Sequence, residues 1–129
     1  MVVRVTLWVL RVCAVLALIL GIVFWTGNTP SSLVSIHMLL GILVVLSLWV
    51  IAVATATAKG GNWGLSGGAL VLGLVIVALG LTQTGILKAA SLHWIIQVIH
   101  LLLGLSAIGL GEAMAGRYKR SNATRTATA

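Results

Sequence analysis

Three histidines are the side chains in this sequence whose type and spacing best suit chemistry. They are His37, His93 and His100, and each lies in a long apolar run. An ionisable side chain inside a membrane segment is costly, and it is a functional candidate by default. Neutral imidazole is an axial ligand of haem iron, and two such ligands give a low-spin centre suited to electron transfer. The histidines therefore predict a bis-histidine haem site.

A short repeated motif surrounds two of these histidines. Residues 36–42 read Ile-His-Met-Leu-Leu-Gly-Ile, and residues 99–105 read Ile-His-Leu-Leu-Leu-Gly-Leu. On a helix, Gly41 and Gly104 share the face of the histidine that lies four residues before them. A residue without a side chain at that place leaves room for a flat ring. Small residues also serve ordinary packing between membrane helices.

The second axial ligand is open between two residues. The repeat favours His37 with His100, whereas His93 would lie nearer the surface and is the alternative. Measured from the expected helix midpoints, both miss His37 in depth by roughly 5–6 Å at ~1.5 Å per residue. His93, Gln97 and His100 share one helix face at i, i+4, i+7 spacing. Gln97 and the unused histidine could hydrogen-bond a propionate or a ligand ring.

Arg11 and Glu112 are the other ionisable groups inside apolar runs, and Glu112 is the only acid in the chain. They fall on helices expected to be neighbours, which predicts a structural ion pair. The alternative is a proton or substrate site around Glu112, as in a small transporter. No phosphate loop, nucleophile triad or paired carboxylate motif occurs, so no catalytic residue is predicted. An electron-transfer or haem-binding protein is expected rather than a catalyst.

The composition places these residues in a membrane. Of 129 residues, 60% are hydrophobic and 7% charged, whereas a soluble domain is about 45–50% apolar and about 25% charged. These values exclude a soluble globular enzyme and a disordered chain. Four apolar runs are each long enough to span a bilayer as a helix. They cover residues 5–26, 33–58, 65–87 and 92–115, and we expect one transmembrane domain over residues 1–116.

The connections between these runs are short, so consecutive helices must be antiparallel neighbours. This predicts an all-α, up-down-up-down four-helix bundle, in which the second and fourth helices lie diagonally across the core. Nearly all basic residues fall on one side, with Lys88 on the other. The positive-inside rule then places both termini in the cytoplasm and the chain in the plasma (inner) membrane. The residues on the cytoplasmic side are Arg4, Lys59, Arg117, Lys119, Arg120 and Arg125.

The net charge of +7 is explained by topology and anionic lipid, and no nucleic-acid partner is expected. Residues 117–129 are predicted to be a basic, disordered cytoplasmic tail. Cys13 lies in an apolar run and is expected to act as a small hydrophobe. The candidate partners are the lipid bilayer, a quinone or redox protein, and a second copy of the chain. Interfacial anchors are expected at Trp8, Trp25, Trp63 and Trp94.

With histidines on the second and fourth of four helices, the chain resembles one half of the haem A synthase family. Members of that family look like two fused four-helix bundles, and the matching positions are His37 and one of His93 or His100. Small four-helix b-type cytochromes fit equally well. The family's functional Glu has no counterpart in residues 31–36, and the outer-loop cysteine pair of many members is absent, so haem hydroxylation is not expected. The resemblance implies one haem b per chain in a half-sized unit.

A function without a cofactor is the main alternative. The lack of catalytic groups and the glycine-rich helices suit a non-enzymatic membrane subunit or assembly partner, whose glycines would serve helix–helix contacts.

Overall fold

A computed structural model describes residues 1–27, 29–58, 60–82 and 93–127. All regular structure in these ranges is helical, which confirms the predicted all-α class. Each helix is long and apolar enough to cross a membrane, and the chain is therefore described as a membrane protein. The helices are α1 (Val2–Trp25), α2 (Ser31–Thr57), α3 (Trp63–Thr82) and α4 (His93–Ala127).

Each predicted apolar run corresponds to one helix, and the differences lie at the ends. The first three helices begin two or three residues earlier than predicted. The predicted end of the third helix and the start of the fourth fall partly in residues 83–92, outside the described residues. The largest difference is α4, which continues to Ala127 instead of ending near Ala115. Residues 117–127 contain no glycine or proline, so the predicted tail holds no strong helix breaker.

The turns after α1 and after α2 are short and use glycine where the backbone requires it. Gly27 after α1 and Gly60 after α2 both have positive φ angles, 85° and 72°, which glycine adopts without steric cost. A Cβ on Gly61 would collide with the backbone carbonyl of Ala56. The turn after α2 therefore folds tightly against the end of that helix. This brings α3 directly alongside α2.

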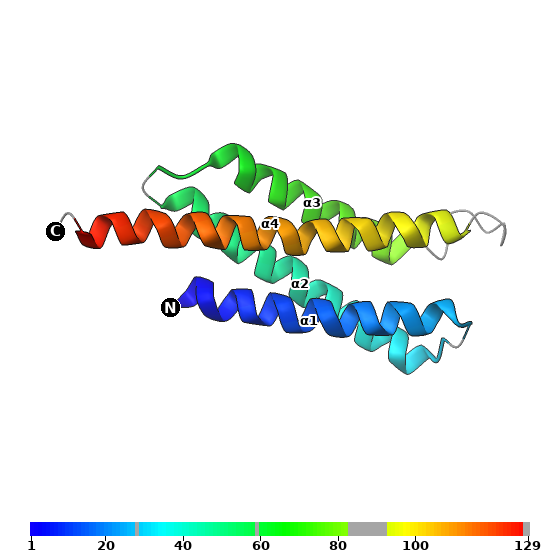
Figure 1. Ribbon diagram of the computed structural model, residues 1–129. Coiled ribbons are helices and arrows are strands. Elements are labelled where there is room, and N and C mark those ends of the chain that lie inside the picture. The colour runs from blue at the N-terminus through cyan, green and yellow to red at the C-terminus, as the bar shows by residue number, and fades with distance from the viewer. Residues whose placement is uncertain (28, 59, 83–92, 128–129) are drawn as a thin grey trace.

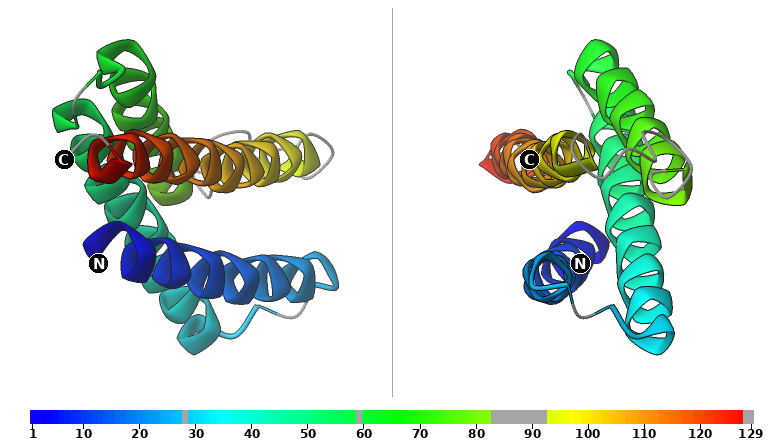
Figure 2. Two further views of the ribbon diagram at one scale, coloured as in Figure 1. Left: turned by 60° about the vertical axis from the view of Figure 1, so that its left-hand side comes forward. Right: turned by 90° about the vertical axis from the view of Figure 1, so that its right-hand side faces the viewer.

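The four helices form two layers that cross at an angle. Figure 2 shows α1 with α4 in one layer and α2 with α3 in the other. All pairs of helices are in contact except α1 with α3, among the residues that the structure describes. The two histidine-bearing helices, α2 and α4, thus lie on the short diagonal of the bundle and touch directly. The start of α1 and the last turns of α4 lie on the same side of Figure 1.

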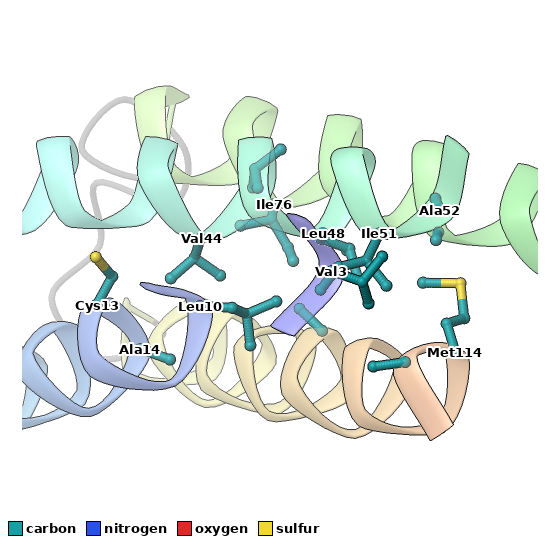
Figure 3. Close-up of a cluster of buried hydrophobic side chains, with 14 residues drawn as sticks. Val3, Leu10, Cys13, Ala14, Val44, Leu48, Ile51, Ala52, Ile76 and Met114 are labelled. Carbon is teal, nitrogen blue, oxygen red and sulfur yellow. The ribbon is translucent and has the colours of Figure 1, made fainter. Parts of the chain in front are cut away.

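The hydrophobic core lies between α1, α2 and α4, with α3 closing one side (Figure 3). Lipid tails are as apolar as these side chains, so close van der Waals packing stabilises the contact more than removal from water does. The largest fully buried side chains are Leu10, Val45, Leu48, Ile51 and Met114.

Packing is uneven along the bundle. The buried residues concentrate in the half that contains the start of α1 and the end of α2. In the other half, formed by residues 15–25, 31–43, 77–82 and 93–106, Ile96 is the only buried residue of those described. That loosely packed half contains the three histidines.

Candidate functional site

His37 and His100 meet in the loosely packed half of the bundle. Their ring centroids are 6.3 Å apart and their planes are inclined by 50°. His37 is the seventh residue of α2 and His100 the eighth of α4, so they lie roughly 9 and 10 Å from the starts of their helices. The depth mismatch calculated from helix midpoints therefore does not prevent His100 from lying beside His37. The extra length of α4 is all at its C-terminal end, which moves the midpoint but not the histidine.

All four helices contribute to the surroundings of the two imidazoles. Phe24 of α1 packs edge-on against His37, with ring centroids 5.5 Å apart. A Cβ on Gly21 of α1 would lie 3.7 Å from Cε1 of His37, and one on Gly80 of α3 would lie 3.5 Å from Cε1 of His100. These are ordinary van der Waals distances. The two glycines therefore let the backbones of α1 and α3 approach the rings closely.

The two histidines are placed in equivalent ways by the two helix hairpins. Each imidazole lies against a glycine of the helix that precedes its own: Gly21 for His37 and Gly80 for His100. Each also has a glycine four residues later on its own helix, Gly41 for His37 and Gly104 for His100. The repeated motif is thus accompanied by a repeated contact, because each histidine lies against a glycine of the preceding helix that is not part of the motif.

Both imidazoles keep a nitrogen without a partner. Nδ1 of His37 and Nδ1 of His100 are buried, and neither makes a hydrogen bond within the part of the chain that the structure describes. A buried polar group without a partner generally costs about 1–3 kcal/mol. These two atoms, on rings whose centroids are 6.3 Å apart, are therefore available to a group outside the protein chain.

The distance between the two imidazoles is compatible with two ligands of one metal ion. Two imidazoles bound at about 2 Å to opposite sides of one metal ion have ring centroids roughly 6 Å apart, close to the observed 6.3 Å. A Cβ on Gly41 or Gly104 would meet no atom within 4 Å. Open space therefore adjoins both histidines on their own helix faces.

His93 and Gln97 lie apart from the histidine pair. His93 is the first residue of α4, roughly 10 Å along the helix from His100. Both His93 and Gln97 are half-buried, and neither forms a ring contact or hydrogen bond among the described side chains. The structure thus brings His100, and not His93, to His37.

The histidine pair does not by itself complete a metal site. No group of three or more His, Cys, Asp or Glu side chains occurs in the described residues. Two imidazoles fill two coordination positions, and another group must supply the rest. Porphyrin nitrogens do so in a haem, whereas a structural zinc site takes all four ligands from protein.

Arg11 and Glu112 form the predicted ion pair between α1 and α4. Nε of Arg11 donates to Oε1 of Glu112 at 2.5 Å, and Nη2 donates to Oε2 at 2.8 Å. The guanidinium also lies 5.3 Å from the ring centroid of Trp8. Arg11 is the tenth of 24 residues in α1, so the pair lies near the middle of a membrane-spanning helix. Both carboxylate oxygens are engaged, which makes this pair a link between helices.

Comparison with known proteins identifies no relative. No family model, curated protein or solved structure matches the chain.

Three neighbours of the histidines, Phe24, Gly21 and Gly80, were not expected from the sequence. A weak signal exists for the glycines, because each helix contains a Leu-Gly-Ile or Leu-Gly-Leu triplet, with glycines at 21, 41, 80 and 104. Gly73 also lies in a Leu-Gly-Leu triplet, but it packs against Trp49. The triplet thus indicates close approach between helices and not histidine binding in particular.

Proposed function

We propose that this protein is a small membrane cytochrome that holds one haem b between His37 and His100. The observation that carries the proposal is the pair of facing imidazoles, each with an unpartnered buried nitrogen. The loose packing of the same half of the bundle supports it, because a bound macrocycle would supply the missing contacts. Haem supplies one-electron redox chemistry when bound.

The chain's own residues have distinct parts in this proposal. His37 and His100 would hold the haem iron, and two histidine ligands would favour electron transfer over binding of a small ligand. Gly41 and Gly104 keep space beside the rings. Phe24 covers one side of His37 with an apolar ring and excludes water there. His93 remains the alternative ligand, and Gln97 lies on the same face for a polar contact to the edge of the haem.

The proposed setting is the plasma (inner) membrane, with the four helices crossing it up-down-up-down and both termini in the cytoplasm. The distribution of basic residues supports this orientation. Four exposed tryptophans fit it as well, because Trp25 and Trp94 lie towards the end with the histidines, while Trp8 and Trp63 lie towards the other. The haem site then lies in the outer half of the bilayer.

The proposed role agrees with the resemblance to one half of the haem A synthase family, and equally with small b-type cytochromes. Electron transfer between a quinone and a redox protein is the proposed reaction. A haem in the outer half of the membrane lies within reach of an outer-side partner. A second copy of the chain is a further proposed partner.

A reduced-minus-oxidised absorbance spectrum of the purified protein tests the proposal directly. The protein is produced under haem-replete conditions, and a pyridine haemochrome assay gives the haem content per chain. We expect sharp reduced α and Soret bands and one haem. His37→Ala and His100→Ala should each abolish the low-spin spectrum, because either change removes an axial ligand.

His93→Ala is the matched control, since it removes an imidazole from the same helix seven residues away. It should keep the low-spin spectrum. Loss of the spectrum in His93→Ala, with retention in His100→Ala, would assign the second ligand to His93. A colourless wild-type protein would overturn the haem proposal and favour the alternative of a membrane subunit without a cofactor.

A further inference from the structure

A polar cavity lies at the end of the bundle opposite the histidine pair. It has a volume of about 260 Å³ and lies between the turn after α2 and the C-terminal part of α4. Arg117, Tyr118 and Arg120 line it from α4, and Gly61 and Asn62 line it from the turn. Ligand sites for drug-sized molecules are about 300–1,000 Å³. This cavity suits a smaller group.

The charge of the cavity is positive. Two arginines line it and no acidic side chain does. The only acid in the chain is Glu112, and Arg11 occupies both of its oxygens. No carboxylate side chain of this protein is therefore left to balance the positive charge of Arg117.

The backbone and one amide add hydrogen-bonding capacity. Asn62 caps α3, because its Oδ1 accepts a hydrogen bond from the backbone N–H of Leu65 at 2.9 Å. Its side-chain NH₂ group remains a donor at the cavity. The start of α3 at Trp63 contributes the positive end of a helix dipole, while the end of α2 contributes the negative end. The arginines therefore set the sign of the local potential.

The place of this cavity in the molecule points to its ligand. It lies at the end of four membrane-spanning helices, the depth at which lipid headgroups occur. Arg binds phosphate oxygens through a planar fork of N–H donors. We infer that the cavity between α4 and the turn after α2 binds the phosphate group of an anionic phospholipid headgroup, with Arg117 as the charged ligand and Asn62 as a polar one.

Native mass spectrometry of the full-length protein in detergent tests this inference. Dioleoyl phosphatidylglycerol is the probe, and dioleoyl phosphatidylcholine is the neutral comparison. Wild type should retain the anionic lipid preferentially. Arg117→Gln should weaken retention roughly ten-fold or more, the effect of losing charge-assisted hydrogen bonds. Lys119→Gln is the matched control, because this basic residue is exposed on α4 and does not line the cavity. Its retention of the anionic lipid should fall at most roughly five-fold, the effect of one surface charge.

A second variant guards against misfolding of the first. Asn62→Asp places a negative charge at the cavity, while its carboxylate can still cap α3 by accepting from Leu65. It should also weaken retention of phosphatidylglycerol. Equal losses in Arg117→Gln and Lys119→Gln would overturn the site in favour of diffuse charge attraction, as would unchanged binding in Asn62→Asp. Inorganic phosphate is the last arm, because Arg117-dependent displacement of the lipid by equimolar phosphate would assign the cavity to the free anion.

Discussion

At the scale of single residues, the Arg11–Glu112 pair decides between two roles for the only acid in the chain. A proton or substrate site needs a carboxylate that can exchange its partner. Here both oxygens of Glu112 accept from one guanidinium, and the side chains are 40% and 38% exposed on the surface of the bundle. In lipid, either charge alone would be strongly unfavourable. The pair is therefore a structural link between α1 and α4.

A double-mutant cycle tests this role. Arg11→Leu and Glu112→Leu should each lower the thermal unfolding midpoint in detergent, because each leaves a single charge on an apolar helix surface. The double variant should recover much of the loss, since it leaves no charge at all. Arg4→Leu serves as the control for loss of a basic residue at the start of the same helix. Simple additivity of the two single losses would contradict the link.

The histidine pair shows how much of the candidate site can be predicted from residue types in an apolar sequence. Few ionisable residues occur in the helices, so His37, His100, Arg11 and Glu112 could be selected from the sequence as candidates. The two contacts then follow from which helices are neighbours. The repeat favoured His100 over His93 but left the choice open, and the structure places the ring of His100 beside that of His37.

At the scale of the helices, the sequence predicts that they exist but not which faces meet. All four are apolar on every side, so periodicity does not distinguish a face towards lipid from a face towards another helix. For this reason Gly21 and Gly80 could not be placed beside the histidines in advance. The uneven packing was equally hidden, since Leu, Ile and Val occur throughout both halves of the bundle.

Gly73 gives the clearest helix-scale prediction. A Cβ there would collide with the indole nitrogen of Trp49 and come close to Val45, so Gly73→Ala must displace a large side chain between α2 and α3. We expect a loss of about 1–3 kcal/mol in the free energy of unfolding, typical of overpacking. Gly68→Ala is the matched control on α3, because a Cβ at that position meets no atom within 4 Å. Unfolding by denaturant in detergent measures both.

Gly68→Ala should be neutral or slightly stabilising, because alanine favours a helix by up to about 1 kcal/mol over glycine. If Gly73→Ala proved as stable as Gly68→Ala, α3 would pack less closely on α2 than the structure indicates. In that case the unpartnered indole nitrogen of Trp49 would not lie against Gly73.

At the scale of the whole molecule, α4 joins three features at different depths. His100, Glu112 and Arg117 follow each other at intervals of twelve and five residues, or roughly 18 and 8 Å along the helix. The histidine pair, the ion pair and the basic cavity are thus separated along the membrane normal. The proposed haem near one surface and the proposed headgroup site near the other would require a fixed orientation of the bundle, which the positive-inside rule predicts.

This orientation can be measured with single cysteines introduced into a Cys13→Ala background. Thr29 precedes α2, and Ala123 lies in the last part of α4; both side chains are exposed. Thr29→Cys should react with a membrane-impermeant maleimide in intact cells if the turn at the histidine end faces outward, as the proposed orientation requires. Ala123→Cys should react only after permeabilisation. The reverse pattern would place the histidine pair in the cytoplasmic half and would remove the argument for an outer-side redox partner. It would leave the internal geometry of the histidine pair unchanged, because that geometry depends on contacts between helices and not on which side of the bilayer they face.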